Sequence, residues 1–349
     1  MKKLLTLVMA CTMILTTACG TSKSVDTVST ATENVESTVA EEKETSVEST
    51  VAQMTETITI KSYNAEKQLV DLEVPYNPER IAILDMASLD IIDAIGMGDR
   101  VVGSASTSIE YLMDYVPSDS NNIANLGTIK TADLVEVAAC EPDIIFIGGR
   151  LGSVYNDLSE IAPVVFLSTD NELGVVESTA ANAKTIASIF GKEDEIDEMM
   201  SQYNERINAI KAEFEGKNAI VGMYSGSNYS VLGNDGRCSI IGKELGFNNM
   251  GVDAGEITST HGNEASWETI VSLNPEYMFV MDRNSAINSD EGNPAVKDAI
   301  ENELIKGLDV YKNGNIVYLA HPNVWYTAEG GIQALDVMLS DIEKALMNK

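Results

Sequence analysis

The chain has 349 residues, 44% of them hydrophobic and 6% aromatic, which is normal for a globular protein and long enough for two ordinary domains. Its formal net charge is −31. Nucleic acids are held by clustered lysine and arginine, which such a surface mostly lacks, so this charge argues against a nucleic-acid partner. Any anionic ligand therefore needs a local basic site.

The first residues predict an export signal. A lysine pair precedes an apolar run over residues 4–15, which is too short for a membrane-spanning helix, and small residues then lead to Cys19. The stretch "LTTACG" (15–20) resembles a bacterial lipobox, whose cysteine is diacylated, although Thr16 stands where leucine is usual. The alternative is an ordinary secretory signal cleaved elsewhere. We expect a lipoprotein signal peptide over 1–19 and a lipid anchor on the extracytoplasmic face of the cell membrane.

Residues 20–55 predict a disordered stalk. They are mostly Thr, Ser, Val and Glu, with no aromatic residue, leucine or isoleucine, so they cannot bury enough apolar surface to offset the entropy of ordering. Two of the four cysteines belong to the signal. The other two, Cys140 and Cys238, lie far apart in the sequence, and we expect two free buried thiols rather than a disulfide.

From residue 56 the pattern is that of an α/β protein. Residues 56–172 begin with a hairpin pattern and then alternate short buried strands with amphipathic helices, which predicts a parallel sheet. Residues 173–216 keep helical spacing with one interruption at Gly191. Over residues 217–349 the alternation resumes and ends in a helix. We predict two three-layer lobes with mostly parallel sheets, joined by a long rigid helix, with the ligand cleft between them.

Two phrases in the two lobes repeat one pattern. "EPDIIFIGGR" (141–150) and "NPEYMFVMDR" (274–283) each place a proline and an acidic residue before an apolar run, and each ends in arginine. Ligands of parallel α/β sheets sit beyond the carboxyl ends of the strands, where both phrases end. We expect Arg150 and Arg283 to face one shared cleft, although an arginine at a strand end is often only solvated.

Arg237 is the third candidate for the cleft. It lies in "YSVLGNDGRCSIIG", where a glycine-rich turn leads from a strand to a helix. Three guanidinium groups in one pocket would suit a large, planar polyanion, because arginine offers forked donors and stacks on aromatic rings. The alternative is a turn arginine in solvent.

The histidines and one tyrosine bear on metal chemistry. His261 and His321 are the only two histidines, too few for a zinc or manganese cage. One histidine with one phenolate could still serve Fe(III), and His261 and Tyr326 both lie in predicted loops. Read alone, a loop histidine is more often structural, and "VWY" is usually core packing. We assign His321 no role.

The chain resembles the ferric-siderophore substrate-binding lipoproteins of ABC importers, which have two α/β lobes joined by a rigid helix. The resemblance covers residues 60–349 and is closest to the subgroup that binds catecholates of the petrobactin and enterobactin type. It rests on stretches that include "NPERIAILDMASLDIIDAIGMGDRVVG", "NLGTIKTADLVEVAACEPDIIFIGGR", "STHGNEASWETIVSLNPEYMFVMDR" and "VWYTAEGG".

The resemblance implies roles for particular residues. Arg150, Arg237 and Arg283 would hold the anionic iron complex, and His261 with Tyr326 would complete iron coordination when a tetradentate bis-catecholate leaves two sites open. Trp325, beside that tyrosine, joins the expected ligand-binding set.

It also implies partners. One acidic residue on each lobe would dock onto the membrane permease: Glu268 on the C-terminal lobe and, because Thr131 replaces the usual glutamate, Asp133 or Glu136 on the N-terminal lobe. We expect a monomer with no intrinsic cofactor, which binds Fe(III) as a siderophore complex.

Two alternatives stay open. A protein of the same fold could bind haem or a cobalamin instead. An exported hydrolase is the alternative from another class, but the sequence contains no G-x-S-x-G elbow and no P-loop, so we expect no enzyme. The sequence does not indicate which siderophore is bound or with how many donor atoms.

Overall fold

The computed structural model describes residues 56–251, 261–287 and 295–347. The predicted signal peptide, the lipidation site Cys19 and the predicted stalk lie outside these ranges. No helix within them is both long enough and apolar enough to cross a membrane.

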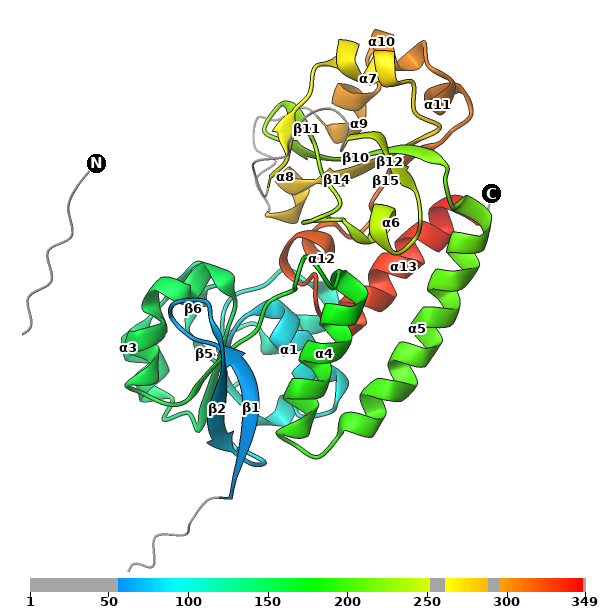
Figure 1. Cartoon of the computed structure of the whole chain (residues 1–349). Coiled ribbons are helices and arrows are strands. Elements are labelled where there is room, and N and C mark those ends of the chain that lie inside the picture. The colour runs from blue at the N-terminus through cyan, green and yellow to red at the C-terminus, as the bar shows by residue number, and fades with distance from the viewer. Residues whose placement is uncertain (1–55, 252–260, 288–294, 348–349) are drawn as a thin grey trace, which may run out of the picture. The chain divides into compact units, whose positions relative to one another are not determined.

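An antiparallel hairpin and a parallel sheet build the N-terminal lobe (Figure 1). The sheet has the strand order β5-β4-β3-β8-β9, and every neighbouring pair in it is parallel. The strands are β1 (Thr57–Tyr63), β2 (Leu69–Pro75), β3 (Ile81–Leu84), β4 (Val101–Ser104), β5 (Ala124–Asn125), β6 (Gly127–Thr128), β7 (Thr131–Ala132), β8 (Ile144–Ile147) and β9 (Val164–Phe166). The helices are α1 (Met86–Ala94), α2 (Leu134–Ala139) and α3 (Tyr155–Ser159), with 3-10 turns at Gly98–Arg100, Glu110–Tyr115 and Gly149–Val154.

Two helices lead out of this lobe. They are α4 (Val175–Ser188) and α5 (Glu193–Phe214), separated at Gly191, whose φ of 65° is readily adopted only by glycine. With 22 residues, α5 spans about 33 Å at 1.5 Å per residue and carries the chain into the second lobe. The predicted interruption and the predicted bridging helix are thus both present.

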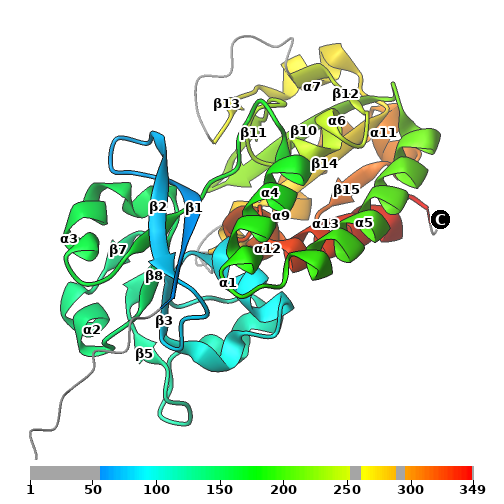
Figure 2. The ribbon, with the colours of Figure 1, turned by 60° about the horizontal axis from the view of Figure 1, so that its bottom comes forward.

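The C-terminal lobe holds a mixed sheet of order β13-β11-β10-β14-β15, with β12 beside β10 (Figure 2). β10 pairs in parallel with β14, and β14 with β15, while β11 and β13 are antiparallel. The strands are β10 (Asn218–Ser225), β11 (Asn228–Val231), β12 (Asn248–Asn249), β13 (Asn263–Glu264), β14 (Tyr277–Asp282) and β15 (Ile316–Tyr318). The helices are α6 (Ile240–Lys243), α7 (Trp267–Leu273), α8 (Arg283–Ala286), α9 (Val296–Ile300), α10 (Glu303–Lys306), α11 (Asp309–Lys312), α12 (Pro322–Thr327) and α13 (Ile332–Leu346).

The repeated phrases are equivalent structural units. Before each proline the chain takes the left-handed conformation that ends a helix, at Glu141 (φ 46°) and at Asn274 (φ 44°). The acidic residue after each proline accepts backbone N–H groups where the neighbouring central strand begins. Asp143 accepts from Glu79 and Arg80 at 2.9 Å, next to β3.

In the other lobe, Glu276 accepts from the first residue of β10, Asn218, at 3.0 Å. In each repeat, the segment therefore ends a helix and aligns two parallel strands. Its arginine then lies just past the carboxyl end of a strand.

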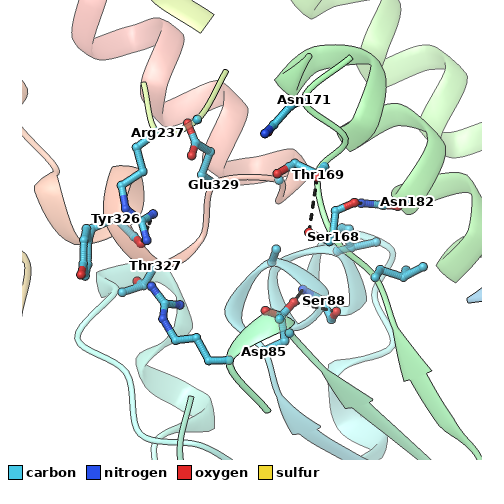
Figure 3. Close-up of a pocket in the computed structure, with 18 of the residues that line it drawn as sticks. Asp85, Ser88, Ser168, Thr169, Asn171, Asn182, Arg237, Tyr326, Thr327 and Glu329 are labelled. Carbon is cyan, nitrogen blue, oxygen red and sulfur yellow. Dashed lines mark hydrogen bonds between the residues drawn. The ribbon is translucent and has the colours of Figure 1, made fainter. Parts of the chain in front are cut away.

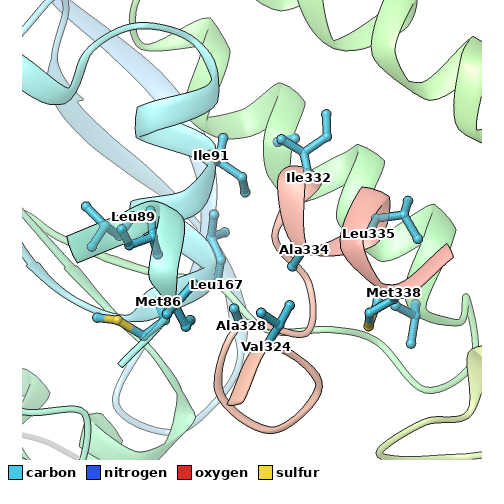
Figure 4. Close-up of a cluster of buried hydrophobic side chains, with 14 of the residues drawn as sticks. Met86, Leu89, Ile91, Leu167, Val324, Ala328, Ile332, Ala334, Leu335 and Met338 are labelled. Carbon is cyan, nitrogen blue, oxygen red and sulfur yellow. The ribbon is translucent and has the colours of Figure 1, made fainter. Parts of the chain in front are cut away.

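The two lobes share apolar packing. One cluster of buried side chains runs from the N-terminal sheet through α1, α12 and α13 to the face of the C-terminal sheet that carries Phe279 and Met281. Figure 4 shows the part of this cluster in which side chains of α1, α12 and α13 lie together. The alternate residues of β14, Met278 and Val280, face a separate cluster on the other side of that sheet. Because α12 and α13 belong to the shared cluster, movement of one lobe against the other disturbs a packed core.

A buried carboxylate joins α13 to α1. Asp90 is fully buried on α1 and accepts the N–H groups of Gln333 and Ala334, both at 2.8 Å, and the hydroxyl of Tyr111 at 2.7 Å. It thereby satisfies the free donors at the first turn of α13 and lies at the positive end of the helix dipole. A Cβ at Gly331 would lie 2.5 Å from the Asp90 carboxyl carbon, so only glycine allows this approach.

We predict that Asp90→Ala lowers the free energy of unfolding by about 2–4 kcal/mol, because it removes the acceptor of two helix N–H groups and of a partly buried tyrosine hydroxyl. Urea denaturation would measure the change. Asp71→Ala is the control: Asp71 is exposed and pairs with the exposed Lys61, so its loss should cost less than about 1 kcal/mol. Equal effects of the two substitutions would contradict the role of Asp90.

Candidate functional site

A cavity of about 590 Å³ is lined by residues of both lobes (Figure 3). Its N-terminal side is formed by the segments that follow β3, β8 and β9, by α4 and by the β1–β2 turn. Its C-terminal side is formed by the turn before α6 and by the end of α12. The lining residues that carry polar side chains are Lys67, Asp85, Ser88, Arg150, Ser168, Thr169, Asn171, Asn182, Asp235, Arg237, Tyr326, Thr327 and Glu329.

Tyr326 is the point on which the three predicted arginines converge. The guanidinium carbons of Arg237, Arg283 and Arg150 lie 4.2, 5.4 and 5.8 Å from the centre of its ring. Arg283 also donates from Nε to the Tyr326 hydroxyl at 3.0 Å, and Arg237 donates from Nη1 to its carbonyl at 3.2 Å. Arg283 and His261 do not line the cavity itself, but the tyrosine places both next to it.

The two strand-end arginines come from the repeated phrases. Arg150 follows β8 in a 3-10 turn and is exposed at the cavity, while Arg283 is the first residue of α8, directly after β14. Asp282 caps α8 and Ser225 accepts from Arg283 Nη1 at 3.2 Å, so the second guanidinium is held in place.

These three positive charges lack ion-pair partners. Within the described ranges, no carboxylate lies within salt-bridge distance of any of them. The other three arginines are used structurally: Arg206 pairs with Asp336 and Glu343, and Arg80 and Arg100 donate to backbone carbonyls. Three positive charges around one ring repel each other, so the arrangement favours the binding of an anion between them.

The same charges lower the pKa of both candidate iron ligands. Burial raises the pKa of Tyr326, but the hydrogen bond from Arg283 and the arginine charges outweigh it and hold this pKa below its usual value. Burial and the charges of Arg237, Arg283 and Arg150 lower the pKa of His261, whose ring lies 6.3 Å from that of Tyr326. Both shifts are toward the deprotonated phenolate and the neutral imidazole, the forms in which these groups bind metals.

The orientation of Tyr326 limits how readily its hydroxyl can coordinate a metal ion. The residue is 3% exposed, and its hydroxyl accepts a hydrogen bond from Arg283. Direct coordination of a metal by this phenolate therefore requires the side chain to leave the position seen here. In this position the ring is a platform on which the guanidinium groups stack.

Trp325 differs from its expected place. It is fully buried, donates from Nε1 to Asp341 at 2.9 Å and is absent from the cavity lining, so it is a core residue rather than a ligand contact. Asp341 also accepts from the His321 backbone at 3.1 Å and binds the His321 ring at 2.7 Å. These bonds fix the start of α12 on α13 and thereby position Tyr326.

Three carboxylic acids line the cavity, namely Asp85, Asp235 and Glu329, and burial raises the pKa of two of them. Burial raises the pKa of Asp85, and hydrogen bonds from Ser88 and the charge of Arg150 oppose this. Burial likewise raises the pKa of Glu329 to about 7, against the charge of Arg237 and a hydrogen bond from the Cys238 N–H at 2.9 Å.

The remaining predicted residues lie on other surfaces. Glu136 and Glu268 are exposed in the first turns of α2 and α7, one on each lobe. Asp133 caps α2, and Thr131 is exposed on β7. Cys140 and Cys238 are free and buried, as expected. The described ranges contain no cluster of three or more His, Cys, Asp or Glu side chains fit to hold a metal ion.

Several cavity residues were not predicted. Asp85 and Ser168 follow β3 and β9 as Arg150 follows β8, so the strand-end argument applied to every strand would have found them. Glu329 lies in the "VWYTAEGG" stretch, but nothing in the sequence indicates that it faces the cavity. Lys67 sits in a hairpin turn, and only the placement of that hairpin brings it to the site.

Comparison with known proteins points to one family. A family model described as "Periplasmic binding protein" matches residues 81–322. Petrobactin-binding protein YclQ of Bacillus subtilis is 32% identical over 276 residues, or 78% of this chain and 84% of YclQ. The crystal structure of YclQ aligns with a TM-score of 0.75 and 30% identity, over 84% of this chain and 100% of that one.

Two further crystal structures are similar. The iron uptake ABC transporter substrate-binding protein PiuA of Streptococcus pneumoniae has a TM-score of 0.73 at 30% identity, over 83% of this chain and 98% of that one. The periplasmic catecholate-siderophore binding protein VctP of Vibrio cholerae has a TM-score of 0.73 at 28% identity, over 83% of this chain and 100% of that one. These likenesses confirm the predicted fold class.

Glu329→Gln is predicted to change the pH dependence of stability. Because the folded-state pKa of Glu329 is raised from 4.5 to about 7, its contribution to stability is present at low pH and is lost as the pH rises through about 7. We expect the free energy of unfolding of the wild type to fall relative to the variant by about 2 kcal/mol between about pH 5 and pH 8. Urea denaturation across this range tests it, and a difference that does not vary with pH would contradict it.

Proposed function

Because the chain belongs to the periplasmic binding protein family, we propose that it captures Fe(III)–siderophore complexes of the catecholate class and delivers them to an ABC importer for iron uptake. One observation carries this proposal: three guanidinium groups without ion-pair partners surround Tyr326 at a cavity between two lobes. The names of the relatives support it, since they include a petrobactin-binding and a catecholate-siderophore binding protein.

The charges of site and ligand match. An Fe(III) tris-catecholate carries three negative charges, and a bis-catecholate carries one. Guanidinium groups donate strong hydrogen bonds to anionic oxygen and stack on the flat catechol rings. In a chain with a net charge of −31, this basic site selects an anion that the rest of the surface repels.

Iron reaches this protein as cargo. A hexadentate siderophore fills the coordination sphere, so His261 and Tyr326 stay outside it. A tetradentate bis-catecholate leaves two positions open for one imidazole and one phenolate, and the lowered pKa of each group favours that binding. Tyr326 would then exchange its hydrogen bond with Arg283 for iron.

The protein acts by binding and not by catalysis. The loaded protein presents its two lobes to the permease, with exposed Glu136 and Glu268 as the acidic contacts. A lipid anchor at Cys19 would hold a monomer at the outer face of the membrane, and the stalk would give it reach.

The first experiment titrates the purified protein with ferric complexes of a bis-catecholate, a tris-catecholate and a hydroxamate, with haemin as control, and follows intrinsic fluorescence. Trp325 is next to Tyr326, and Trp267 stacks on Tyr229, 5.8 Å away, in the same lobe. Saturable quenching by catecholates alone is the expected result. Quenching by haemin alone, or by none of the four, would reject the proposed ligand.

Replacing Arg150, Arg237 and Arg283 together with Gln should weaken binding of a ferric tris-catecholate at least about 100-fold, because each charge-assisted hydrogen bond contributes about 1.5–3 kcal/mol. Arg100→Gln is the control, since Arg100 binds the Asn77 side chain and a backbone carbonyl away from the cavity. Tight binding by the triple variant would rule out the arginine site.

Tyr326→Phe should weaken a bis-catecholate complex about 10-fold more than a tris-catecholate complex, because only the former leaves iron positions for a phenolate. Fluorescence titrations with both complexes measure the two losses. The two ligands control for each other, since the lost Arg283 hydrogen bond affects both. Equal losses would mean that Tyr326 supports the arginines without binding iron.

A further inference from the structure

A lysine in the hairpin turn of the N-terminal lobe lines the same cavity as the arginines. Lys67 lies between β1 and β2 and is exposed at the N-terminal side of the cavity, whereas Arg237 and Tyr326 belong to the C-terminal side. Unlike Arg150, it reaches the cavity from outside the parallel sheet. A ligand in the cavity would therefore lie between Lys67 and the C-terminal lobe.

The turn holds Lys67 in an unusual backbone conformation. Its φ is 57°, in the left-handed region that residues other than glycine and asparagine rarely adopt. Asn64 stabilises this turn: its side chain accepts the N–H groups of Glu66 and Gln68 at 3.1 and 2.9 Å, and its carbonyl accepts that of Lys67 at 3.0 Å. Glycine would adopt this conformation with less strain, so the presence of lysine here suggests that its side chain has a functional role.

The hairpin is fixed to the strand that leads into the cavity. The Phe166 N–H donates to Ser62 Oγ at 2.9 Å, and the rings of Tyr63 and Phe166 lie 5.6 Å apart. β9 ends at Phe166, and the next three residues line the cavity. The position of the turn relative to the cavity is therefore set by buried contacts.

Lys67 also lacks a competing carboxylate. In the described part of the chain, no acidic side chain lies within salt-bridge distance of it, whereas Lys61 on the same hairpin pairs with Asp71 at 2.7 Å. The two lysines lie six positions apart on one hairpin, but of the two only Lys67 lines the cavity.

We propose that Lys67 is a fourth cationic contact for the bound anion and makes the cavity discriminate between ferric complexes by their charge. This rests on the proposed function. The ammonium group, on a long flexible side chain, would approach ligand oxygens on the side away from Tyr326. Its contribution increases with ligand charge, so it favours a tris-catecholate (three negative charges) over a bis-catecholate (one) and an uncharged hydroxamate complex.

The test compares Lys67→Gln with Lys61→Gln, which removes the same charge from the same hairpin. Dissociation constants are measured by fluorescence quenching for the three ferric complexes. We expect Lys67→Gln to raise the dissociation constant of the tris-catecholate about 10-fold and that of the bis-catecholate about 2-fold, with less salt dependence than in the wild type. Lys61→Gln should change each value less than about 2-fold.

A third variant separates binding from folding. Lys67→Gly removes the charge but suits the left-handed turn, so its melting temperature should equal or exceed that of the wild type while tris-catecholate binding weakens as in Lys67→Gln. A purely structural lysine predicts unchanged binding in this variant.

Unchanged dissociation constants for Lys67→Gln, or losses equal to those of Lys61→Gln, would overturn the inference while the wild type still binds. A wild type that binds none of the ferric complexes would overturn the proposed function, and this inference with it.

Discussion

The position of α12 and α13 between the lobes is the constraint on which the site depends. Two buried carboxylates hold this segment. Asp90 satisfies the first turn of α13 from the N-terminal lobe, and Asp341 on α13 binds Trp325 and His321 at α12. Tyr326 follows Trp325 directly, so these bonds place its ring where arginines from both lobes meet. A shift of α13 would therefore change the binding site.

This construction also limits how far the lobes can move. The apolar cluster that includes α12 and α13 continues into both lobes, and α5 packs on α13. Close-packed side chains resist gradual deformation, so large hinge motion would cost buried contacts. Capture therefore depends mainly on a preformed set of charges rather than on closure around the ligand, and a preformed site spends little binding energy on ordering side chains.

The distribution of arginine explains how an acidic protein attracts an anion. Of six arginines, three are used structurally away from the cavity, and three surround Tyr326 without an ion-pair partner in the described ranges. Lys67 adds a further positive charge from the N-terminal side of the cavity, whereas Arg237 and Tyr326 lie on its C-terminal side. Burial raises the pKa of Asp85 and Glu329, a shift toward their neutral forms, in which they do not offset this positive charge. Positive charge is therefore concentrated around the Tyr326 ring, in contrast to the acidic chain as a whole.

The amino-acid sequence by itself determined the α/β architecture, the interruption at Gly191 and the convergence of Arg150 and Arg283. Each of these follows from local patterns: hydrophobic periodicity, a glycine that interrupts a helical pattern, and the rule that ligands bind beyond the carboxyl ends of parallel strands. The predicted roles of the individual site residues came from resemblance, and their geometry came from the structure.

Only the tertiary structure decided which side chains face the cavity. Trp325 and Tyr326 are neighbours in the sequence, but successive residues of a helix point in different directions. Trp325 is therefore buried against Asp341, whereas the ring of Tyr326 contacts the arginines. Lys67 and Glu329 reach the cavity through the packing of β1 on β9 and of α12 on the turn before α6. Such placements depend on contacts between segments far apart in the chain, which no local pattern records.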